Sequence, residues 1–417
     1  MTGTPVSTPF RVAICSGVYV EKDGISGSIA CKLALFERLR RNGAPVEAMV
    51  YCHGTDRPGP RVTEHANVAD LLLHPGFLCA DVYCFEFGVH NDLFDTIFVL
   101  PTRAAKLGVY HNVTPLELVG EAQRPVVRRS LAQRYNLFET GHVVCVSEFN
   151  RRDLLGIGFP PERMSVVPCP TPPTRLVRLP TKLVRQDAGP IEFLFVGRFV
   201  RAKGVIELLE AAEQLAAENP PPFRLTLVFN RSFSDPKLLA WLDERMRREP
   251  ARPWLRLVPS ATDAELAEEY RSADCFVIPS HHEGFCIPVI EALWAGCHVL
   301  AADAGNLPFI LDGLGKLFPV RDADRLAGAM RRVLHELHDA RTAGRVPVLD
   351  TDRGRMPAEE WANAVDVHLQ GFSLEVFETG FASALRASLA AAGREIPDWL
   401  LPGKFEALAG IDPAVAA

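Results

Sequence analysis

The sequence predicts an α/β protein made of two doubly wound, Rossmann-like domains. Short apolar segments rich in β-branched and aromatic residues alternate with segments of helical spacing along most of the 417 residues. This alternation is typical of parallel sheets covered by helices. The chain also exceeds the roughly 250–300 residues at which a single hydrophobic core stops growing. Because a proline-rich stretch interrupts the alternation near the middle, we expect two domains, each with its own core.

The first domain is expected over residues 1–170. Its helical segments have one apolar face: in Ser28–Asn42, the side chains of Ile29, Leu33, Phe36 and Leu39 fall on one side of the helix. The predicted strands between such segments are Phe10–Cys15, Val46–Cys52, Asp81–Glu86, Leu107–His111 and His142–Ser147.

Residues 171–190 are predicted to form a linker, because the prolines between Pro168 and Pro190 cannot all be accommodated inside helices or strands. The alternation resumes in a second domain over residues 191–340. Its predicted strands are Ile191–Val196, Phe223–Phe229, Trp254–Val258, Cys275–Ile278 and His298–Ala301, and its predicted helices are Val205–Glu218, Leu238–Arg248, Asp263–Arg271, Pro288–Ala295 and Ala323–His335. Two such domains would place a ligand cleft between them.

Residues 341–417 are less regular and are predicted to form a helical tail. Two segments, Trp361–Phe372 and Phe377–Ala392, have helical spacing, and we expect them to pack across the domain boundary.

Composition excludes several classes of protein. The 45 Lys and Arg against 51 Asp and Glu give a net charge of −6, which argues against a nucleic-acid-binding protein. No Gly-x-Gly-x-x-Gly follows a first strand, so a dinucleotide cofactor is disfavoured. The start of the chain has no signal-peptide pattern, and no apolar run reaches the roughly 20 residues of a membrane span. The ten cysteines lack any Cys-x-x-Cys and mostly lie in apolar segments, so we expect buried thiols and a cytoplasmic location.

Two loops of the second domain carry the candidate chemistry. The strand Ile191–Val196 leads into a loop with Arg198 and Lys203, and the strand Cys275–Ile278 leads into a loop with Glu283. If the sheet has the common strand order 3-2-1-4-5-6, these two strands are neighbours, and both loops face the same crevice.

The residue types in these loops fit a nucleotide sugar. Two cations, together with the backbone N–H groups at the start of the helix after Cys286, make an anion site suited to phosphates. Carboxylates such as Glu283 and Glu291 can each accept two hydrogen bonds from neighbouring hydroxyls of a sugar or a ribose.

These segments resemble the retaining glycosyltransferases of family 4, also called group 1, which have the two-domain GT-B fold. The resemblance runs from about Phe10 to Leu334 and is strongest in residues 195–204 and 273–296, which include the Glu-x7-Glu motif. Residues 110–115 and 145–151 also look like segments of the family's first domain. The resemblance implies two Rossmann-like domains that face each other across a cleft.

Each matching position carries an implied role. Arg198 and Lys203 would neutralise the donor diphosphate, Glu283 would hold the transferred sugar, and Glu291 would hold the ribose. The base would lie near 258–260. The residues implied in donor binding are Gly197, Arg198, Lys203, Ser260, Glu283, Gly284, Phe285, Cys286 and Glu291, and those implied in catalysis are Glu283, His111, Arg198 and Lys203.

The acceptor side is less specific. Gly24 and Gly27 stand where the family has a Gly-rich loop after the first strand. Glu86 and His90 follow another strand of the first domain, where they either contact the acceptor or form a cap or turn. The four arginines Arg124, Arg128, Arg129 and Arg134 form either a surface for anionic lipid or a solvated helix face.

The function expected from the site and the resemblance is glycosyl transfer. The donor would be a UDP- or GDP-linked sugar and the acceptor a hydroxyl of a glycan, glycolipid or natural product, with retention of configuration. Neither cofactor nor metal is expected, because Arg198 and Lys203 supply the positive charge. The Asp-x-Asp pairs, Asp322/Asp324 and Asp350/Asp352, are expected to serve as caps. The alternative is a non-catalytic protein of the same fold that binds a nucleotide sugar or a glycan.

Overall fold

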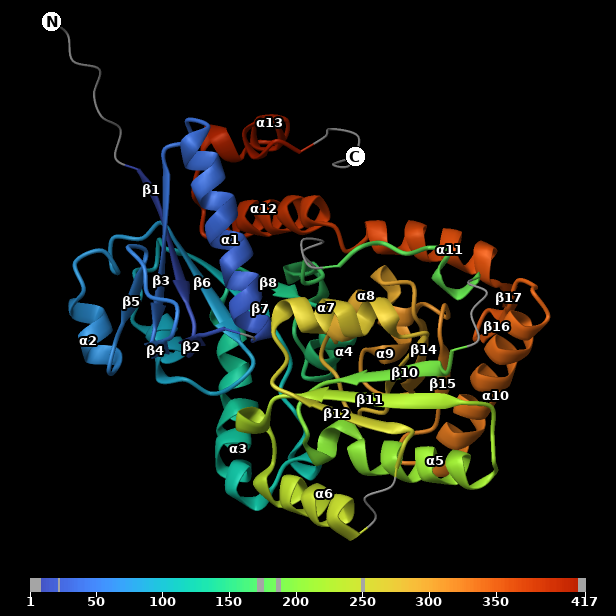
Figure 1. Ribbon diagram of the computed structural model, residues 1–417. Helices are drawn as coiled ribbons and strands as arrows, with labels where there is room; N and C mark the ends of the chain where they lie inside the picture. Colours follow the sequence, from blue (N-terminus) through green and yellow to red (C-terminus); the bar gives the residue numbers. More distant parts are fainter. Residues whose placement is uncertain (1–8, 22, 171–175, 185–188, 249–251, 412–417) are drawn as a thin grey trace, which may run out of the picture. The chain divides into compact units, whose positions relative to one another are not determined.

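The computed structural model describes residues 9–21, 23–170, 176–184, 189–248 and 252–411 (Figure 1). Two stretches of the predicted linker, 171–175 and 185–188, lie outside these described residues. The chain forms two compact units. The first comprises Met1–Leu116, Gly120–Pro170 and Ser373–Ala417, and the second comprises Glu117–Val119 and Thr171–Phe372.

The first unit contains a seven-stranded parallel sheet with the order β5-β3-β1-β6-β7-β8-β9. Its central strands are buried on both faces, which explains why they read as continuous apolar runs. The strands are β1 (Phe10–Cys15), β3 (Val46–Cys52), β5 (Val62–Glu64), β6 (Val82–Phe87), β7 (Ala105–Tyr110), β8 (His142–Cys145) and β9 (Met164–Val166), beside a small pair, β2 (Val18–Tyr19) and β4 (Gly54–Thr55).

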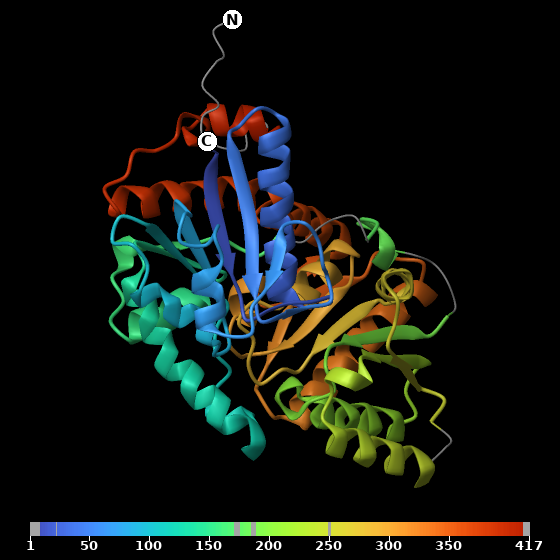
Figure 2. The same ribbon diagram turned by 90° about the vertical axis from the view of Figure 1, so that its left-hand side faces the viewer.

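Helices from both ends of the chain cover this sheet. The C-terminal helix α12 packs against β7 and β8, and α13 packs against α1 (Figure 2). The helices are α1 (Gly24–Arg41), α2 (Val68–Leu73), α3 (Arg124–Gln133), α4 (Glu148–Gly156), α12 (Leu374–Ala391) and α13 (Lys404–Ala409), with 3-10 turns that include η1 (Asp92–Phe98), η4 (Arg134–Glu139) and η9 (Asp398–Leu400).

The second unit contains a six-stranded parallel sheet with the order β12-β11-β10-β13-β14-β15. Numbered along the chain, this is 3-2-1-4-5-6, the common order on which the shared crevice depends. The strands are β10 (Ile191–Val196), β11 (Phe223–Phe229), β12 (Leu255–Pro259), β13 (Cys275–Ile278), β14 (His298–Ala302) and β15 (Lys316–Phe318), and an antiparallel hairpin is formed by β16 (Val348–Thr351) and β17 (Gly354–Pro357).

The helices of the second unit are amphipathic and bury one face. In α10 the buried residues continue to Leu337 and Ala340, which explains why this helix extends beyond its predicted end at His335. The helices are α5 (Val205–Ala217), α6 (Pro236–Arg248), α7 (Asp263–Ser272), α8 (Ile287–Trp294), α9 (Leu307–Leu311), α10 (Ala323–Thr342) and α11 (Ala358–Gln370), and the 3-10 turn η7 (Arg201–Lys203) precedes α5.

Helix α1 begins earlier than expected. The side chain of Asp23 accepts hydrogen bonds from the amide and the hydroxyl of Ser26, and this N-cap starts the helix at Gly24. Gly24 and Gly27 therefore lie in the first turn of a helix, and the expectation that they form a loop is wrong.

Candidate active site

The two loops predicted to share a crevice lie side by side in the second unit. Strands β10 and β13 pair in parallel, with Phe193 opposite Cys275, so both strands end at the same edge of the sheet. The amide of His281 donates to the carbonyl of Ala202 over 2.8 Å and joins the loops. Gly204 allows this contact: its φ is +66°, and a Cβ there would lie 2.0 Å from a backbone oxygen of the other loop.

Lys203 and Glu283 form the central ion pair of this site. The Lys203 Nζ atom lies 2.6 Å from Glu283 Oε1, and the side chains are 19% and 9% exposed. Burial by itself would raise the pKa of Glu283, but the adjacent ammonium group lowers that pKa below its usual value. Glu283 is therefore a carboxylate at neutral pH and can accept hydrogen bonds.

Gly305 and Asn306 hold the Glu283 loop, and sequence analysis missed both. The Asn306 amide donates to the Glu283 carbonyl and its side chain donates to the Phe285 carbonyl, each over 2.9 Å. Gly305 has a φ of +55°, and a Cβ there would lie 2.5 Å from the Glu283 carbonyl oxygen. These residues follow β14, the strand next to β13, so their position at that strand end was the available signal.

Helix α8 begins directly after the Glu283 loop. Cys286 precedes it in the left-handed conformation, with a φ of 81°, which is strained for a residue other than glycine. Within α8, Glu291 Oε2 accepts a hydrogen bond of 2.9 Å from the hydroxyl of the buried Tyr270. This bond fixes the direction of the Glu291 carboxylate at the half-buried surface of the helix.

The remaining predicted donor residues lie at the same edge of the sheet. Arg198, after β10, is exposed, and no carboxylate among the described residues pairs with it. Ser260 follows β12, has a φ of 63°, and donates its amide to Phe229 over 2.7 Å.

In the first unit, His111 and Glu86 lie at the ends of the neighbouring strands β7 and β6. The His111 Nε2 atom is 2.7 Å from Glu86 Oε2, and Lys32 Nζ of α1 is 2.5 Å from Glu86 Oε1. The Glu86 side chain is fully buried, so it cannot bind an acceptor directly, and that expectation is corrected. Burial would raise the pKa of Glu86, but Lys32 and His111 lower it below its usual value.

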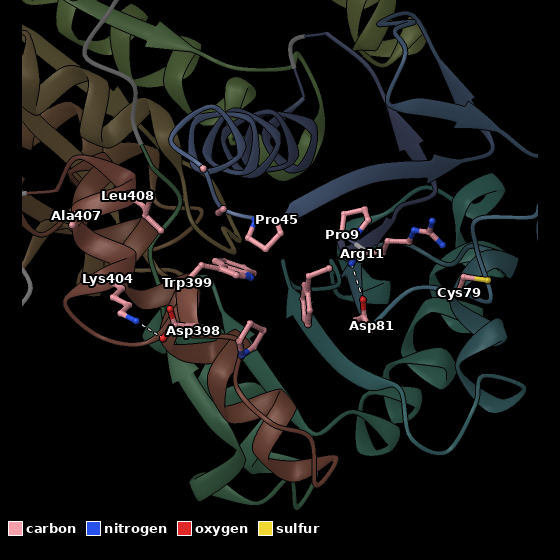
Figure 3. Close-up of a pocket in the computed structure, with 14 residues that line it drawn as sticks. Pro9, Arg11, Pro45, Cys79, Asp81, Asp398, Trp399, Lys404, Ala407 and Leu408 are labelled. Carbon is pink, nitrogen blue, oxygen red and sulfur yellow. Dashed lines mark hydrogen bonds and ion pairs between the residues drawn. The ribbon is translucent and has the colours of Figure 1, made fainter. Parts of the chain in front are cut away.

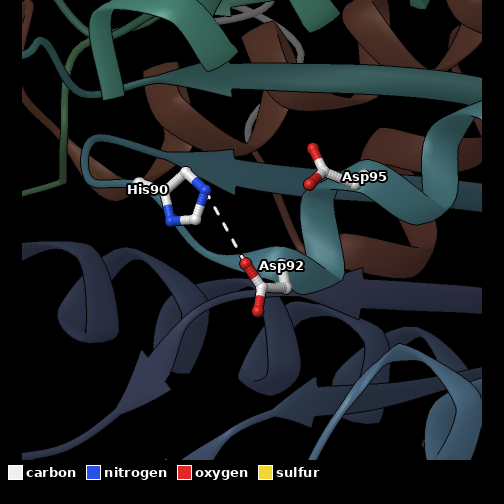
Figure 4. A group of neighbouring side chains, drawn as sticks. All are labelled: His90, Asp92 and Asp95. Atoms are coloured by element: carbon white, nitrogen blue, oxygen red, sulfur yellow. Dashed lines mark ion pairs between the residues drawn. The ribbon is translucent and has the colours of Figure 1, made fainter. Parts of the chain in front are cut away.

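His90, Asp92 and Asp95 form a group that could hold a metal ion (Figure 4). One ligand atom from each lies within 4.8 Å of the others. Among the residues that the structure describes, this is the one such group of three. Asp95 already accepts hydrogen bonds from Gln133 and Asn136, over 2.7 and 2.8 Å. Sequence analysis singled out His90 but not the two aspartates.

A cavity of about 740 Å³ lies at the amino ends of strands of the first unit, opposite the carboxyl ends that carry Glu86 and His111 (Figure 3). It is lined by Phe10 and Asp81, at the amino ends of β1 and β6, and by Trp399 and Lys404 from the C-terminal segment. Because His111 lies at the carboxyl end of β7, this cavity is separate from the candidate site of the same unit.

The other candidate motifs serve structural roles. Asp322 caps α10 by accepting a hydrogen bond from the amide of Arg325, as expected. Asp350 and Asp352 do not act as caps: they lie 3.2 and 3.4 Å from Lys316 Nζ, which corrects that expectation.

Two observations concern contact with a membrane. On α3 three of the four arginines, Arg124, Arg128 and Arg129, are exposed, whereas Arg134 pairs with Asp153. Among the described helices, none has the length and apolarity needed to cross a bilayer.

Comparison with known proteins finds a family model that matches most of the second unit. The family model described as glycosyl transferases group 1 matches residues 183–345. O-antigen chain mannosyltransferase B of Escherichia coli is 27% identical over 203 residues, which are 47% of this chain and 51% of that protein. The chain spans between 50% and 63% of the length of the first curated relatives that it matches.

Solved structures identify the fold. Sucrose-phosphate synthase from Thermosynechococcus elongatus has a TM-score of 0.64 at 19% identity, covering 92% of this chain and 100% of that one. Anabaena HepE in complex with UDP and glucose has a TM-score of 0.61 at 15% identity, covering 91% and 100%. The chain therefore has the fold of GT-B glycosyltransferases, with two parallel-sheet α/β units as predicted, and its residues 183–345 match the family model of group 1 glycosyl transferases.

Proposed function

We propose that the protein is a glycosyltransferase that moves a sugar from a nucleoside-diphosphate sugar to a hydroxyl of a glycan, a glycolipid or a natural product, with retention of anomeric configuration. The observation that carries this proposal is the ion pair between Lys203 and Glu283 at the ends of two adjacent strands. It brings a cation and an ionised carboxylate together inside the group 1 region.

Lys203 and Arg198 are proposed to bind the diphosphate. Arg198 is exposed and has no carboxylate partner among the described residues, so it is available to an incoming anion. Lys203 is bound to Glu283, and a diphosphate would draw the ammonium group away from that carboxylate. Glu283 would then accept hydrogen bonds from hydroxyls of the sugar. The ion pair thus keeps both groups charged until the donor arrives.

The remaining donor contacts are assigned around α8 and β12. The amides of Gly284, Phe285 and Cys286 lie at the start of α8, where the helix dipole favours negative charge. Glu291, oriented by Tyr270, is proposed to bind the ribose, and the base is proposed to lie near Ser260. HepE, which has a similar fold, was solved with UDP, which supports UDP as a donor nucleotide, with GDP as the second candidate.

The chemical step releases a nucleoside diphosphate. The negative charge that develops on it is stabilised by cations and amides that are already in place, so little reorganisation is needed. We propose that the acceptor hydroxyl attacks the face from which the diphosphate departs, with His111 beside the donor sugar and no enzyme nucleophile. A catalytic metal is not required, since Arg198 and Lys203 supply the positive charge.

Nucleotide binding and sugar transfer test the proposal separately. Thermal shifts with UDP, GDP and ADP should show stabilisation by one of them, because a ligand that binds only the folded state raises the melting temperature. Glu283→Gln should keep this shift and lose transfer of the matching sugar. Glu210→Gln, an exposed position on α5, is the matched control.

Two results would contradict the proposal. Unchanged transfer in the Glu283→Gln variant would remove the carboxylate from the mechanism. Tight binding of a nucleotide sugar with neither transfer to any acceptor nor hydrolysis would support the non-catalytic alternative.

We also assign a cytoplasmic location and a weak peripheral contact with anionic lipid. All ten cysteines are free thiols, which is typical of a reducing compartment. The lipid contact is assigned to Arg124, Arg128 and Arg129 on α3. Cosedimentation with vesicles of phosphatidylserine at low salt tests this contact, and absence of sedimentation would leave α3 as a solvated helix face.

A further inference from the structure

Three ionisable side chains form a chain of contacts in the interior of the first unit. Lys32, Glu86 and His111 have side-chain exposures of 1%, 0% and 7%. The carboxylate of Glu86 lies between the other two groups. One of its oxygens binds the ammonium group and the other binds the imidazole.

Stability alone does not explain such a network. Removing two charges from water costs several kcal/mol per ion. Replacing a buried ion pair by apolar side chains of the same volume often leaves the protein as stable or makes it more stable. A buried lysine beneath a histidine at a strand end therefore suggests a role in fixing that histidine.

The contacts of Lys32 hold its ammonium group against Glu86. Its Nζ atom also donates to Ser28 Oγ over 2.9 Å, one turn earlier in α1. On another side the rings of Phe377 and Phe381 lie 5.7 and 5.4 Å from Nζ, which adds cation–π attraction and excludes water. Among the described residues, Glu86 is the one carboxylate that pairs with this ammonium group, so Glu86 stays ionised and fixed.

An ionised Glu86 determines which nitrogen of His111 carries a proton. A carboxylate only accepts hydrogen bonds, so the 2.7 Å contact with Nε2 requires a hydrogen on Nε2. In the neutral ring, Nδ1 is then the acceptor.

We propose that Lys32 is a positioning residue that acts through Glu86: it keeps Glu86 as an acceptor, and Glu86 fixes the Nε2–H tautomer and the ring direction of His111, so that Nδ1 is offered to the substrate. This inference rests on the proposed function, in which His111 lies beside the donor sugar.

The tautomer can be measured without any assay of activity. In protein labelled with ¹⁵N-histidine, the His111 signals are identified by their absence from a His111→Gln variant. We expect a pyrrole-type shift for Nε2 and a pyridine-type shift for Nδ1 at pH 8. A hydrogen on Nδ1 in the wild-type protein would overturn the proposal.

Two variants should reverse the tautomer. In Glu86→Gln, the amide oxygen faces the donor-only ammonium of Lys32, so the amide NH₂ faces Nε2 and moves the ring hydrogen to Nδ1. In Lys32→Met, the buried Glu86 takes up a proton and, as a neutral carboxylic acid, donates a hydrogen bond from its O–H to Nε2, so the ring hydrogen again lies on Nδ1. Retention of the Nε2–H form in both variants would contradict the inference.

Kinetics test whether the positioning matters. We expect Glu86→Gln and Lys32→Met to lower kcat roughly 10- to 100-fold while donor KM stays within about threefold, as for other residues that orient a catalytic group. The double variant Lys32→Met/Glu86→Gln removes both charges, so neither is left in the interior without its partner and the variant is expected to fold. It should melt near the wild-type temperature and still have low kcat, and recovered kcat would show a purely structural role.

Glu378→Gln is the matched control. Glu378 is a buried carboxylate of the same unit that pairs with Arg38 at 2.5 Å rather than with the Lys32, Glu86 and His111 network. Its substitution should lower stability but leave kcat and the His111 tautomer unchanged. Absence of transfer by the wild-type protein would refute the proposed function, whereas active protein with unaffected Lys32 and Glu86 variants would refute only this inference.

Discussion

The ring of Phe381 lies over the ammonium group of Lys32, with 5.4 Å between the ring centroid and Nζ. Phe381 belongs to α12 near the C-terminus, and Lys32 belongs to α1 near the start of the chain. The contact shows that the last part of the chain completes the environment of a charged group close to the candidate site of the first unit.

The Phe381 contact should have a measurable coupling energy with Lys32. A double-mutant cycle of Phe381→Leu and Lys32→Met should give roughly 1–2 kcal/mol, because the cation and the ring are both desolvated. The measurement is the free energy of unfolding in urea. Phe77→Leu, at a fully buried ring elsewhere in this unit, should show no coupling with Lys32→Met. Additive effects for Phe381 would show that the cation–π contact contributes nothing to stability.

Removal of the Lys203 cation should slow sugar transfer. We expect Lys203→Ala to reduce turnover by roughly 30- to 1000-fold, which corresponds to about 2–4 kcal/mol of lost charge stabilisation. Arg201→Ala, at an exposed cation in the same turn, should retain wild-type turnover. Equal turnover in wild-type and Lys203→Ala proteins would show that the diphosphate binds elsewhere.

Gly204 should not tolerate a side chain. In Gly204→Ala the new Cβ would lie 2.0 Å from the Pro279 carbonyl oxygen, so the two loops would separate and Lys203 would move away from Glu283. We expect loss of nucleotide-induced thermal stabilisation. Gly354→Ala is the control, because Gly354 also has a positive φ, of +110°, but a Cβ there would meet no neighbouring atom of the described residues within 4 Å. Normal nucleotide binding by Gly204→Ala would contradict the role of this close approach.

The second unit should lose stability in mild acid because of His298. Burial lowers the pKa of His298 from 6.5 to about 4. Between these two pKa values the unfolded chain binds a proton that the folded chain does not. The contribution of His298 to the free energy of unfolding is therefore complete above about pH 6.5 and is lost as the pH falls toward 4. The loss approaches about 3 kcal/mol at 1.36 kcal/mol per pKa unit.

Calorimetry from pH 7.5 to pH 4.5 measures this loss. His298→Phe should flatten the pH dependence of the melting temperature, whereas His335→Phe, at an exposed position on α10, should preserve it. Parallel curves for wild-type and His298→Phe proteins would contradict the prediction.

Transfer activity should survive removal of divalent cations. After exhaustive treatment with EDTA, we expect the rate of nucleoside diphosphate release to remain unchanged. Loss of activity that manganese or magnesium restores would refute metal independence. In that case Asp92→Asn would show whether the His90, Asp92 and Asp95 group holds the ion.

Most of the second unit's site could be predicted from the sequence because its chemistry lies in two short loops. The strand order makes β10 and β13 neighbours, and this alone places the loops of Lys203 and Glu283 side by side. Gly305 and Asn306 were missed because their role is to hold the backbone of another loop, and their position after β14 was the one signal in the sequence.

The first unit was harder to predict because its network joins residues far apart in the chain. The sequence analysis did not single out Lys32, which lies within the predicted helix Ser28–Asn42, and it gave Glu86 as a candidate for acceptor binding at a strand end. Only the packing of α1 and α12 on the sheet shows that both side chains are buried. Gly24 and Gly27 were misjudged because the cap at Asp23 was not recognised.

The division of the chain also affects the order in which it can fold during synthesis. The second unit is complete when Phe372 leaves the ribosome, but the first unit still lacks α12 and α13 at that moment. Domains usually fold in the order of their synthesis. Here β7 and β8 of the N-terminal sheet lack the helix that packs against them until Leu374–Ala391 has emerged. A chain cut after Phe372 would therefore lack α12 on β7 and β8, although the strands of the first unit were all made earlier.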